Sequence, residues 1–431
     1  MTFHIKNITK RKNSRLIGSH IDSPKAGMQS DAHELNICGW VLGQMDATSS
    51  VVIYCLRADL SDQYLGEFNI EIERPDVISH FQRQDLSIKC GFAIALPLYD
   101  LHSDQTLILK LKTNADEYIQ FAEIAFSRKK ISSDYQPSLN PIIVSTLGRT
   151  GSTLLMRLLS EHPDIVVANK HPYETFALEY WLYVVYQFLS EPEKHLQKAD
   201  TSRFQRDFQC SVQRKKWFSN KYSTDALYFC QQQIEAYYKQ IIAETNSNPP
   251  IYFAEKLQHY AGEGIPTWPY LKLLVKEVYP QVKEIILVRD FRDVILSSIY
   301  FGTKHIPGYD IEKAKNEAYL GVIDEIREFS NYYMRYAESS LLVRYEDLIN
   351  DPLNTLKVIF DFLSLTTNHT TINSIVDSIS NSTQNRHGHI TSGSISKSIS
   401  RWRQELSPEQ QLLYADVFRQ QLSLFGYPTS N

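Results

Sequence analysis

A glycine loop with an arginine inside it is the segment of this chain best suited to hold an anion. Gly148 and Gly151 let the backbone turn its N–H groups inward, and Arg149 between them supplies a fixed positive charge. A helix is expected to begin at this point, and its first amides add positive potential. The loop is therefore predicted to bind a phosphate-like group, with hydroxyl donors at Thr150, Ser152 and Thr153.

The spacing of this loop differs from that of the loop that binds nucleoside triphosphates. That loop has a longer glycine spacing and a lysine directly before its hydroxyl residue. Here the cation, Arg149, stands earlier, inside the loop. The pattern favours one phosphate-like group without a metal partner, and a simple helix N-cap is the alternative.

The elements that must position this loop follow from the apolar pattern around it. Residues 142–144 form a short unbroken apolar run, which is typical of a parallel strand covered on both faces. After the loop, leucines recur on one stripe of a helix, at Leu154, Leu155, Leu158 and Leu159. The segment is thus predicted to be strand, tight loop and helix.

A second junction between a strand and a helix also offers an anion site. Residues 285–288 predict a buried strand that ends on Arg289, and a helix is expected to begin near Asp293. Arg289 can bind a phosphate through two hydrogen bonds, and Ser297 faces back toward the strand end, where parallel sheets bind ligands. A solvated ion-pair cluster is the alternative for Asp290, Arg292 and Asp293.

These two segments together resemble the sulfotransferase superfamily that uses 3′-phosphoadenosine-5′-phosphosulfate (PAPS). The resemblance implies that Arg289 and Ser297 hold the 3′-phosphate. Cytosolic members commonly carry lysine in the loop, and the arginine here is similar to many bacterial relatives. The residues that the resemblance assigns to the 5′-phosphosulfate are Arg149, Thr150, Gly151, Ser152 and Thr153.

Residues 378–404 have the composition of a lid. They contain no acidic residue and are rich in serine, threonine, asparagine and glycine, so they cannot bury a core of their own. Once ordered by a nucleotide, Lys397 and Arg401 are predicted to close on the 3′-phosphate, and Trp402 to cover adenine or to pack on the domain. A merely soluble loop is the alternative.

The implied reaction transfers a sulfuryl group from a mixed anhydride to a hydroxyl or an amine. By analogy with phosphoryl transfer, the protein must position the reactants, neutralise charge and remove a proton from the acceptor. Arg149 and the loop amides can neutralise charge. The resemblance adds Lys256 as a second cation, because related enzymes place a lysine at the end of the strand before the 3′-phosphate segment.

Three residues compete for the role of general base. Glu174 lies shortly after the first helix, where several family branches carry a catalytic glutamate. His259 follows Lys256 by three positions, whereas the cytosolic branch spaces its lysine and histidine one position closer. We place the base at Glu174, with His259 and His171 as alternatives. No metal-ligand spacing involves these residues, and no metal is expected.

Length and composition limit the class of protein. The chain has 431 residues, more than one core usually holds, so two domains are expected. Its net charge of −4 argues against general binding of nucleic acids or anionic membranes. Five cysteines without metal or redox spacing favour a reducing compartment, and no apolar run is long enough to span a bilayer. A cytoplasmic location is therefore expected.

The predicted fold is of the α/β class, with two domains. Residues 141–431 should form a P-loop-like, three-layer α/β/α domain with a parallel sheet, since strands alternate with helical stretches. Residues 22–127 contain short strand-like runs typical of an all-β sandwich. The Cys38-Gly39-Trp40, Arg74–Val77 and Gly91-Phe92 elements in it resemble an accessory β domain beside some bacterial sulfotransferase and glycosyltransferase domains. Residues 1–21 are predicted to be a solvated basic tail and residues 128–140 a linker.

The acceptor stays open, as a small molecule, a carbohydrate or a lipid with a hydroxyl or amine, and the sequence gives no oligomeric state. Residues 173–240 are rich in aromatic side chains that can wall an acceptor pocket or form helix core. Two other functions compete with sulfuryl transfer. One is a P-loop nucleotide kinase, and the other is a non-catalytic protein that binds a nucleotide or a carbohydrate.

Overall fold

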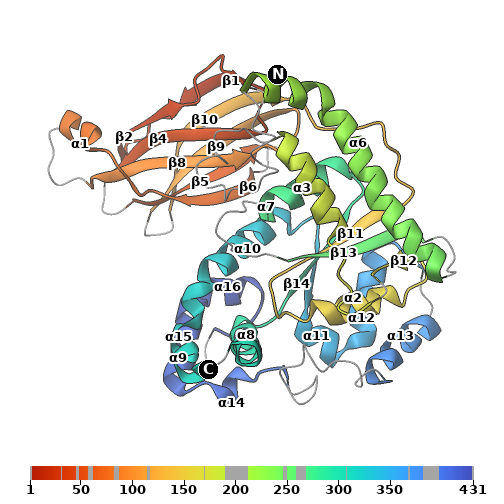
Figure 1. Ribbon diagram of the computed structural model, residues 1–431. Coiled ribbons are helices and arrows are strands. Elements are labelled where there is room, and N and C mark those ends of the chain that lie inside the picture. The colour runs from red at the N-terminus through yellow and green to blue at the C-terminus, as the bar shows by residue number, and fades with distance from the viewer. Residues whose placement is uncertain are drawn as a thin grey trace. The chain divides into compact units, whose positions relative to one another are not determined.

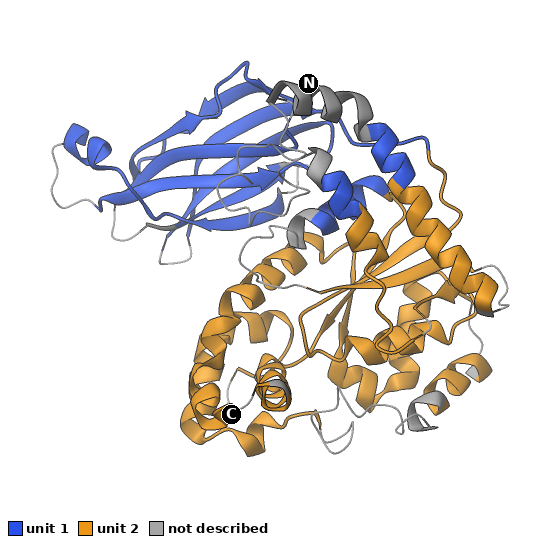
Figure 2. Cartoon of the chain, viewed as in Figure 1, with its two compact units in different colours: residues 1–134, 182–229, 269–278 blue, residues 135–181, 230–268, 279–431 orange. Residues whose placement is uncertain are grey.

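The chain folds into two compact units, which Figure 2 distinguishes by colour. The first unit comprises residues 1–134, 182–229 and 269–278, and the second comprises residues 135–181, 230–268 and 279–431. The computed structural model describes residues 2–30, 32–44, 48–56, 62–81, 87–113, 117–168, 170–189, 212–245, 250–258, 268–306, 308–366, 369–381 and 398–429.

The strands of the first unit form two antiparallel sheets (Figure 1). One sheet has the order β3-β1-β10-β9-β5-β6 and the other has the order β2-β4-β8-β7. The elements are β1 (Phe3–Lys10), β2 (Leu16–Ser23), β3 (Gln29–Ser30), β4 (Glu34–Gly43), β5 (Thr48–Leu56), β6 (Asp62–Asn69), β7 (Ile72–Glu73), α1 (Pro75–Phe81), β8 (Lys89–Pro97), β9 (Asp104–Thr113) and β10 (Tyr118–Arg128).

Both antiparallel sheets bury one face in a shared apolar core. Buried and less buried residues alternate along β4, as expected of a strand with one covered face. Ile5 and Leu109 enter the core from one sheet, and Ile37 and Phe92 enter it from the other. Apolar burial of this kind supplies most of the folding free energy of such a unit.

Residues 1–21 are not the solvated tail that the composition predicted, because β1 and most of β2 lie in this segment. Phe3 and Ile5 alternate with polar residues and are buried in the core. Basic residues of the segment form surface ion pairs, such as Lys6 with Asp104 at 2.5 Å. The prediction followed the basic composition and missed the alternation of apolar and polar residues that is typical of a strand.

The predicted linker also begins inside regular structure, since Arg128 is the last residue of β10. Its guanidinium forms a buried ion pair with Glu277 of α7 (Trp268–Val278). The Glu277 carboxylate accepts further hydrogen bonds from the backbone N–H groups of Asp100 at 2.8 Å and Ile131 at 2.7 Å. Such full pairing is what a buried carboxylate requires.

The second unit is built on a parallel sheet of order β12-β13-β11-β14-β15. Thr146, at the end of β11, pairs with Gln258 of β13 and with Leu287 of β14. The prediction of an α/β chain with a parallel sheet is confirmed. The strands are β11 (Asn140–Thr146), β12 (Ile165–Val166), β13 (Tyr252–Gln258), β14 (Lys283–Val288) and β15 (Leu341–Arg344).

Helices pack on both faces of this sheet. On one face, α2 (Ser152–Ser160), α12 (Pro352–Phe362) and α13 (His369–Asn381) share an apolar core with the strands. On the other face, α6 (Val212–Thr245) and α10 (Ile323–Tyr336) reach strand carboxylates through buried tyrosine hydroxyls. The remaining elements are α3 (Ala177–Leu189), α8 (Phe291–His305), α9 (Ile311–Glu317), η1 (Ala318–Gly321), α11 (Tyr345–Asn350), α14 (Trp402–Glu405), α15 (Pro408–Val417) and α16 (Arg419–Leu424).

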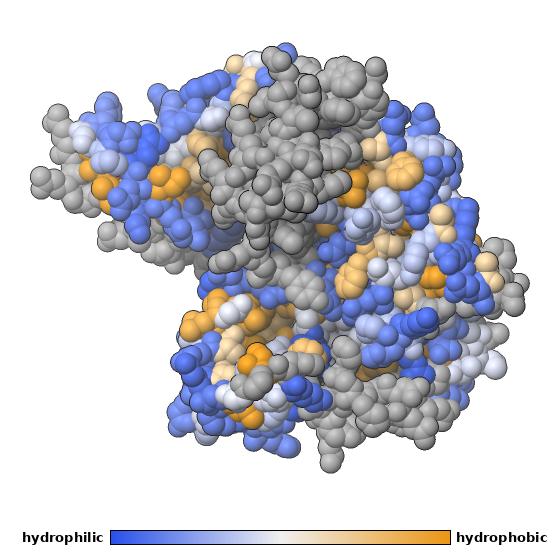
Figure 3. Space-filling model, viewed as in Figure 1, coloured by the Kyte–Doolittle hydropathy of each residue, from blue (hydrophilic) through white to orange (hydrophobic). Residues whose placement is uncertain are grey.

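The described surface is mainly hydrophilic in the view of Figure 3, with apolar side chains gathered in a few patches. Leu320 and Leu412 are among the exposed apolar residues. Some exposure of apolar side chains is ordinary for a folded protein. Within the described residues, no helix has the length and apolar character needed to cross a membrane.

Candidate active site

The cationic site residues Arg149, Lys256 and Arg289 lie at the carboxyl edge of the parallel sheet of the second unit. The glycine loop follows β11, Lys256 lies near the end of β13, and Arg289 follows β14 directly. Because these three strands are neighbours in register, their ends meet along one edge (Figure 1). This edge is where open parallel sheets bind their ligands.

The backbone of the glycine loop is held in an unusual conformation. Arg149 and Gly151 have φ angles of 65° and 91°, in the left-handed region that favours glycine. A Cβ atom on Gly151 would lie 2.3 Å from Cδ2 of Tyr345, so no larger residue fits without movement. The Tyr345 ring therefore packs directly on the loop backbone.

The Thr150 hydroxyl shapes the loop from inside. It hydrogen-bonds to the hydroxyl of Thr146 and donates to the carbonyl of Leu147 at 3.0 Å, and its side chain is buried. Helix α2 begins at Ser152, and its N-cap Gly151 provides no side-chain hydrogen bond. Since a helix leaves its first N–H groups without intrahelical partners, the start of α2 suits an anion.

The two anion sites that the sequence predicted separately form one connected cluster. Arg149 Nε donates to the Ser297 hydroxyl at 3.3 Å, which joins the loop to α8. Arg289 Nη1 donates to the carbonyl of Arg149 at 3.1 Å. Among the described residues, the buried Nε of Arg289 has no hydrogen-bond partner. The cluster therefore retains donor capacity for a ligand.

Burial and like charges shape the electrostatics of this cluster. Burial lowers the pKa of Arg149, and the positive charge of Arg289 lowers it further. Burial and then Arg149 lower the pKa of Lys256 to about 8. Three cationic side chains thus occupy one partly desolvated region, and a bound anion would offset both their burial and their mutual repulsion.

Lys256 and Glu174 form an ion pair, although they come from distant parts of the sequence. The lysine side chain is 2% exposed and the glutamate side chain is 18% exposed. The pair places a proton acceptor, Glu174, beside one of the three cations of the predicted anion site.

Of the two alternative base residues, the structure describes only His171. His171 is exposed, and its ring lies edge-on to Tyr173 with the ring centres 6.2 Å apart. His259 and Lys397 lie outside the described residues. The structure therefore gives no geometry for these two predictions.

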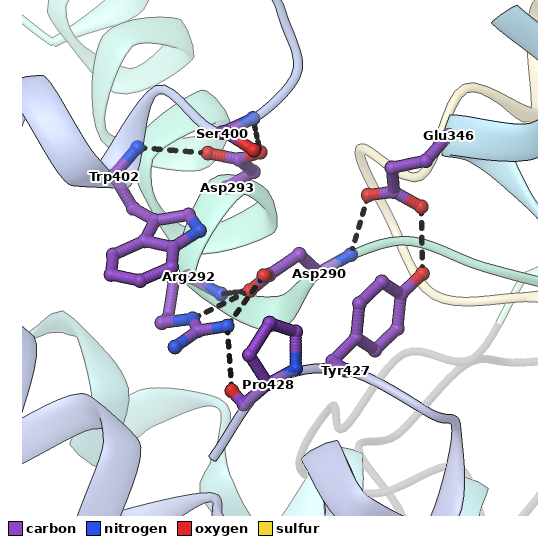
Figure 4. Close-up of polar contacts among 8 residues, drawn as sticks. All are labelled: Asp290, Arg292, Asp293, Glu346, Ser400, Trp402, Tyr427 and Pro428. Atoms are coloured by element: carbon purple, nitrogen blue, oxygen red, sulfur yellow. Dashed lines mark hydrogen bonds and ion pairs between the residues drawn. The ribbon is translucent and has the colours of Figure 1, made fainter. Parts of the chain in front are cut away.

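The end of the predicted lid is tied to the cluster. The Asp293 carboxylate accepts from the backbone N–H groups of Ser400 at 2.7 Å and Trp402 at 3.0 Å (Figure 4). Arg289 Nη2 donates to the Ser398 carbonyl at 2.6 Å, and the Ser398 hydroxyl bonds to that of Tyr345 at 2.9 Å. Residues 398–402 are therefore fixed to the strand end that carries Arg289.

Two lid residues make contacts within the protein. Arg401, predicted to bind the 3′-phosphate, donates through Nε to Glu405 at 2.8 Å, and its guanidinium lies 4.9 Å from the centre of the Tyr300 ring. Trp402 is buried, and the Arg292 guanidinium lies 3.7 Å from its ring centre. Of the two roles considered for Trp402, the structure gives packing on the domain.

The alternative of a solvated ion-pair cluster at Asp290, Arg292 and Asp293 is wrong, because all three are buried. Arg292 donates to the Asp290 carboxylate at 2.9 and 2.7 Å and to the Pro428 carbonyl at 3.0 Å. Burial raises the pKa of Asp293 to about 6. A buried network of this kind fixes the start of α8, as Figure 4 shows.

The sequence assigned no chemistry to two aromatic residues that contact the cations. The guanidinium of Arg149 lies 4.6 Å from the centre of the Phe301 ring, and that of Arg289 lies 4.9 Å from the Tyr345 ring. Phe301 stands one helical turn after Ser297, so helical spacing could have identified it. Tyr345 follows β15 directly, and the rule that ligands bind at strand ends could have identified it.

Comparison with known proteins found a matching family model and distantly similar solved structures. A family model described as "Sulfotransferase family" matches residues 141–369, which is more than half of the chain. The search of curated proteins found no match to this chain. The crystal structure of mouse sulfotransferase SULT7A1 complexed with PAP is 14% identical, with 67% of this chain and 86% of that chain covered and a TM-score of 0.38. Sulfotransferase STF9 from Mycobacterium avium is 15% identical, with 68% and 78% covered and a TM-score of 0.36.

The Gly151→Ala variant tests the close packing of the loop. We expect it to lower the free energy of unfolding by about 1–3 kcal/mol, because the new Cβ meets Tyr345 and the backbone stays in a left-handed conformation. Urea denaturation measures the change. Gly148→Ala is the matched control, since a Cβ there meets nothing within 4 Å. Equal losses in both variants would contradict the packing argument.

Proposed function

This chain belongs to the sulfotransferase family, and we propose that it transfers a sulfuryl group from PAPS to a hydroxyl or amine of its acceptor. The observation that carries the proposal is the convergence of Arg149, Lys256 and Arg289 at one sheet edge. A donor with a 5′-phosphosulfate and a 3′-phosphate brings negative charge at two points. Such a ligand can relieve the repulsion among several cations at once.

The donor would be held by both parts of the cluster. The glycine loop and the first amides of α2 suit the phosphosulfate, and Arg289 with Ser297 suits the 3′-phosphate. The contact between Arg149 and Ser297 supports a single ligand that touches both parts. Arg401 would have to exchange Glu405 for a phosphate to take part.

The chemistry follows from the Glu174–Lys256 pair. As the acceptor oxygen or nitrogen bonds to sulfur, Glu174 would take its proton, and the bond from sulfur to the bridging oxygen of the anhydride would break. Lys256 and Arg149 would then neutralise the charge that develops on the departing bisphosphate. In a loose transition state, this charge stabilisation and the positioning of the reactants supply most of the acceleration.

Calorimetry with adenosine 3′,5′-bisphosphate (PAP), the desulfonated product, tests the donor. We expect PAP to bind without magnesium at least about tenfold more tightly than adenosine triphosphate, a difference of about 1.4 kcal/mol. A preference for the triphosphate that depends on magnesium would favour the kinase alternative. Binding of PAP without transfer of labelled sulfuryl to any of a panel of phenols, sugars and long-chain alcohols would favour a binding protein.

The Glu174→Gln variant tests the base. We expect the transfer rate to fall about 10²- to 10⁴-fold, the usual contribution of general base catalysis, while PAP binding is retained. Single-turnover transfer and calorimetry measure the two quantities. His171→Gln is the matched control for the competing base. Full activity of Glu174→Gln would remove this residue from the mechanism.

The affinity for PAP should fall as the pH rises through about 8, the pKa of Lys256. Below this pH the ammonium is charged and attracts the anion, and above it the neutral amine does not. The fall cannot exceed about tenfold per pH unit for one proton. Lys256→Arg should remove the dependence, because arginine stays charged. A flat profile in the unmodified protein would contradict this role of Lys256.

A further inference from the structure

A second buried carboxylate lies directly behind the proposed catalytic pair. Glu255 precedes Lys256 on β13, and successive residues of a strand point to opposite faces of the sheet. Lys256 forms an ion pair with Glu174, whereas Glu255 accepts hydrogen bonds from residues of α3 and α6. Glu255 is 3% exposed. Nothing in the reaction described above uses it.

Glu255 holds the start of α3. Its Oε1 accepts from the backbone N–H of Leu178 at 2.8 Å, so a carboxylate caps the positive end of this helix. The same oxygen accepts from the hydroxyl of Tyr238 at 2.5 Å. The Tyr238 hydroxyl also bonds to that of Thr175 at 3.0 Å. Thr175 is the immediate neighbour of Glu174.

The segment that carries Glu174 needs such support. Tyr173 and Phe176 have φ angles of 64° and 55°, a region that non-glycine residues rarely adopt. Each such residue costs about 1–3 kcal/mol and persists only where surrounding contacts fix it. Contacts from Glu255 fall on both sides of Phe176, through Leu178 directly and through Thr175 by way of Tyr238.

We propose that Glu255 is a positioning residue, which holds residues 174–178 so that the Glu174 carboxylate meets Lys256 and the proton of the acceptor. The inference rests on the proposed function, because Glu255 acts through Glu174. It touches neither the donor nor the acceptor. Its contribution is to keep a strained loop in the one arrangement that forms the catalytic pair.

The protonation state of Glu255 indicates which substitution should preserve its hydrogen bonds. Burial raises its pKa to about 7, opposed by hydrogen bonds from Tyr238 and Leu178, while the charge of Glu179 raises it further. The carboxyl is therefore readily neutral near physiological pH. A glutamine, which is neutral and has a carbonyl oxygen to accept both hydrogen bonds, should then preserve the geometry.

The matched control is a second buried tyrosine–glutamate pair on the same sheet. The Tyr332 hydroxyl of α10 donates to Glu284 of β14 at 2.9 and 3.1 Å. Glu284 stands near the amino end of its strand, opposite the edge where the site lies. Tyr332→Phe thus removes a similar hydrogen bond without touching the Glu174 segment.

The test is a set of single and double variants, assayed with labelled PAPS and the fastest acceptor of the panel. We expect Glu255→Ala to lower the transfer rate about 10- to 100-fold and Tyr238→Phe about threefold or more, with PAP affinity kept within about threefold. Glu255→Gln should restore the rate to within about threefold of the unmodified protein. Tyr332→Phe should leave the rate unchanged while lowering stability.

A double-mutant cycle separates positioning from general stability. If Glu255 acts through Glu174, Tyr238→Phe or Glu255→Ala should cost less than about twofold in a Glu174→Gln background. Additive losses would overturn the role of Glu255 and leave the base assignment intact. Full activity of Glu174→Gln alone would instead refute the base on which the inference rests.

Amide hydrogen exchange gives a readout that needs no acceptor. Exchange in the peptide that spans residues 173–181 should accelerate in Glu255→Ala and Tyr238→Phe but not in Glu255→Gln or Tyr332→Phe. Tyr238→Phe is the milder change if Glu255→Ala fails to fold. Unchanged exchange in Tyr238→Phe would show that this network does not hold the Glu174 segment, and the inference would fail.

Discussion

Repulsion among buried and partly buried cations is the constraint on which this site depends. Arg149, Lys256 and Arg289 reach one sheet edge, where burial already disfavours positive charge. A folded protein can keep such a cluster only when other contacts hold the cationic side chains in place, because these side chains would otherwise move apart or lose a proton. The strain makes the edge receptive to an anion, which is the property that a donor with two anionic groups requires.

Buried carboxylates fix the backbone that carries the cations. Asp290 pairs with Arg292, and Glu346 accepts from the backbone of Asp290 and from the hydroxyl of Tyr427 at 2.8 Å. Asp293 fixes residues at the end of the predicted lid. The carboxylates thus order the end of β14, and they tie Tyr427 and Pro428 to it. Glu255 repeats this arrangement behind Lys256.

Local patterns in the sequence were enough to predict the strands that carry the site. The unbroken apolar runs before the glycine loop and before Arg289 predicted strands that β11 and β14 contain. Composition was a poorer guide. It assigned residues 1–21 to a tail because their basic residues outweigh the alternation of Phe3 and Ile5, which places them in a strand. It likewise suggested solvated charges around Arg292, where burial depends on the distant Trp402.

The sequence by itself determined which chemical groups are available: a glycine loop with an arginine, cations at strand ends and a carboxylate after the first helix. Only the tertiary structure decided which of these groups meet. The pairing of Glu174 with Lys256, the contact of Arg149 with Ser297 and the burial of Trp402 all join residues far apart in the chain. Propensity and periodicity act over a few residues, whereas strand order and register, set by packing of the whole sheet, decide which strand ends become neighbours.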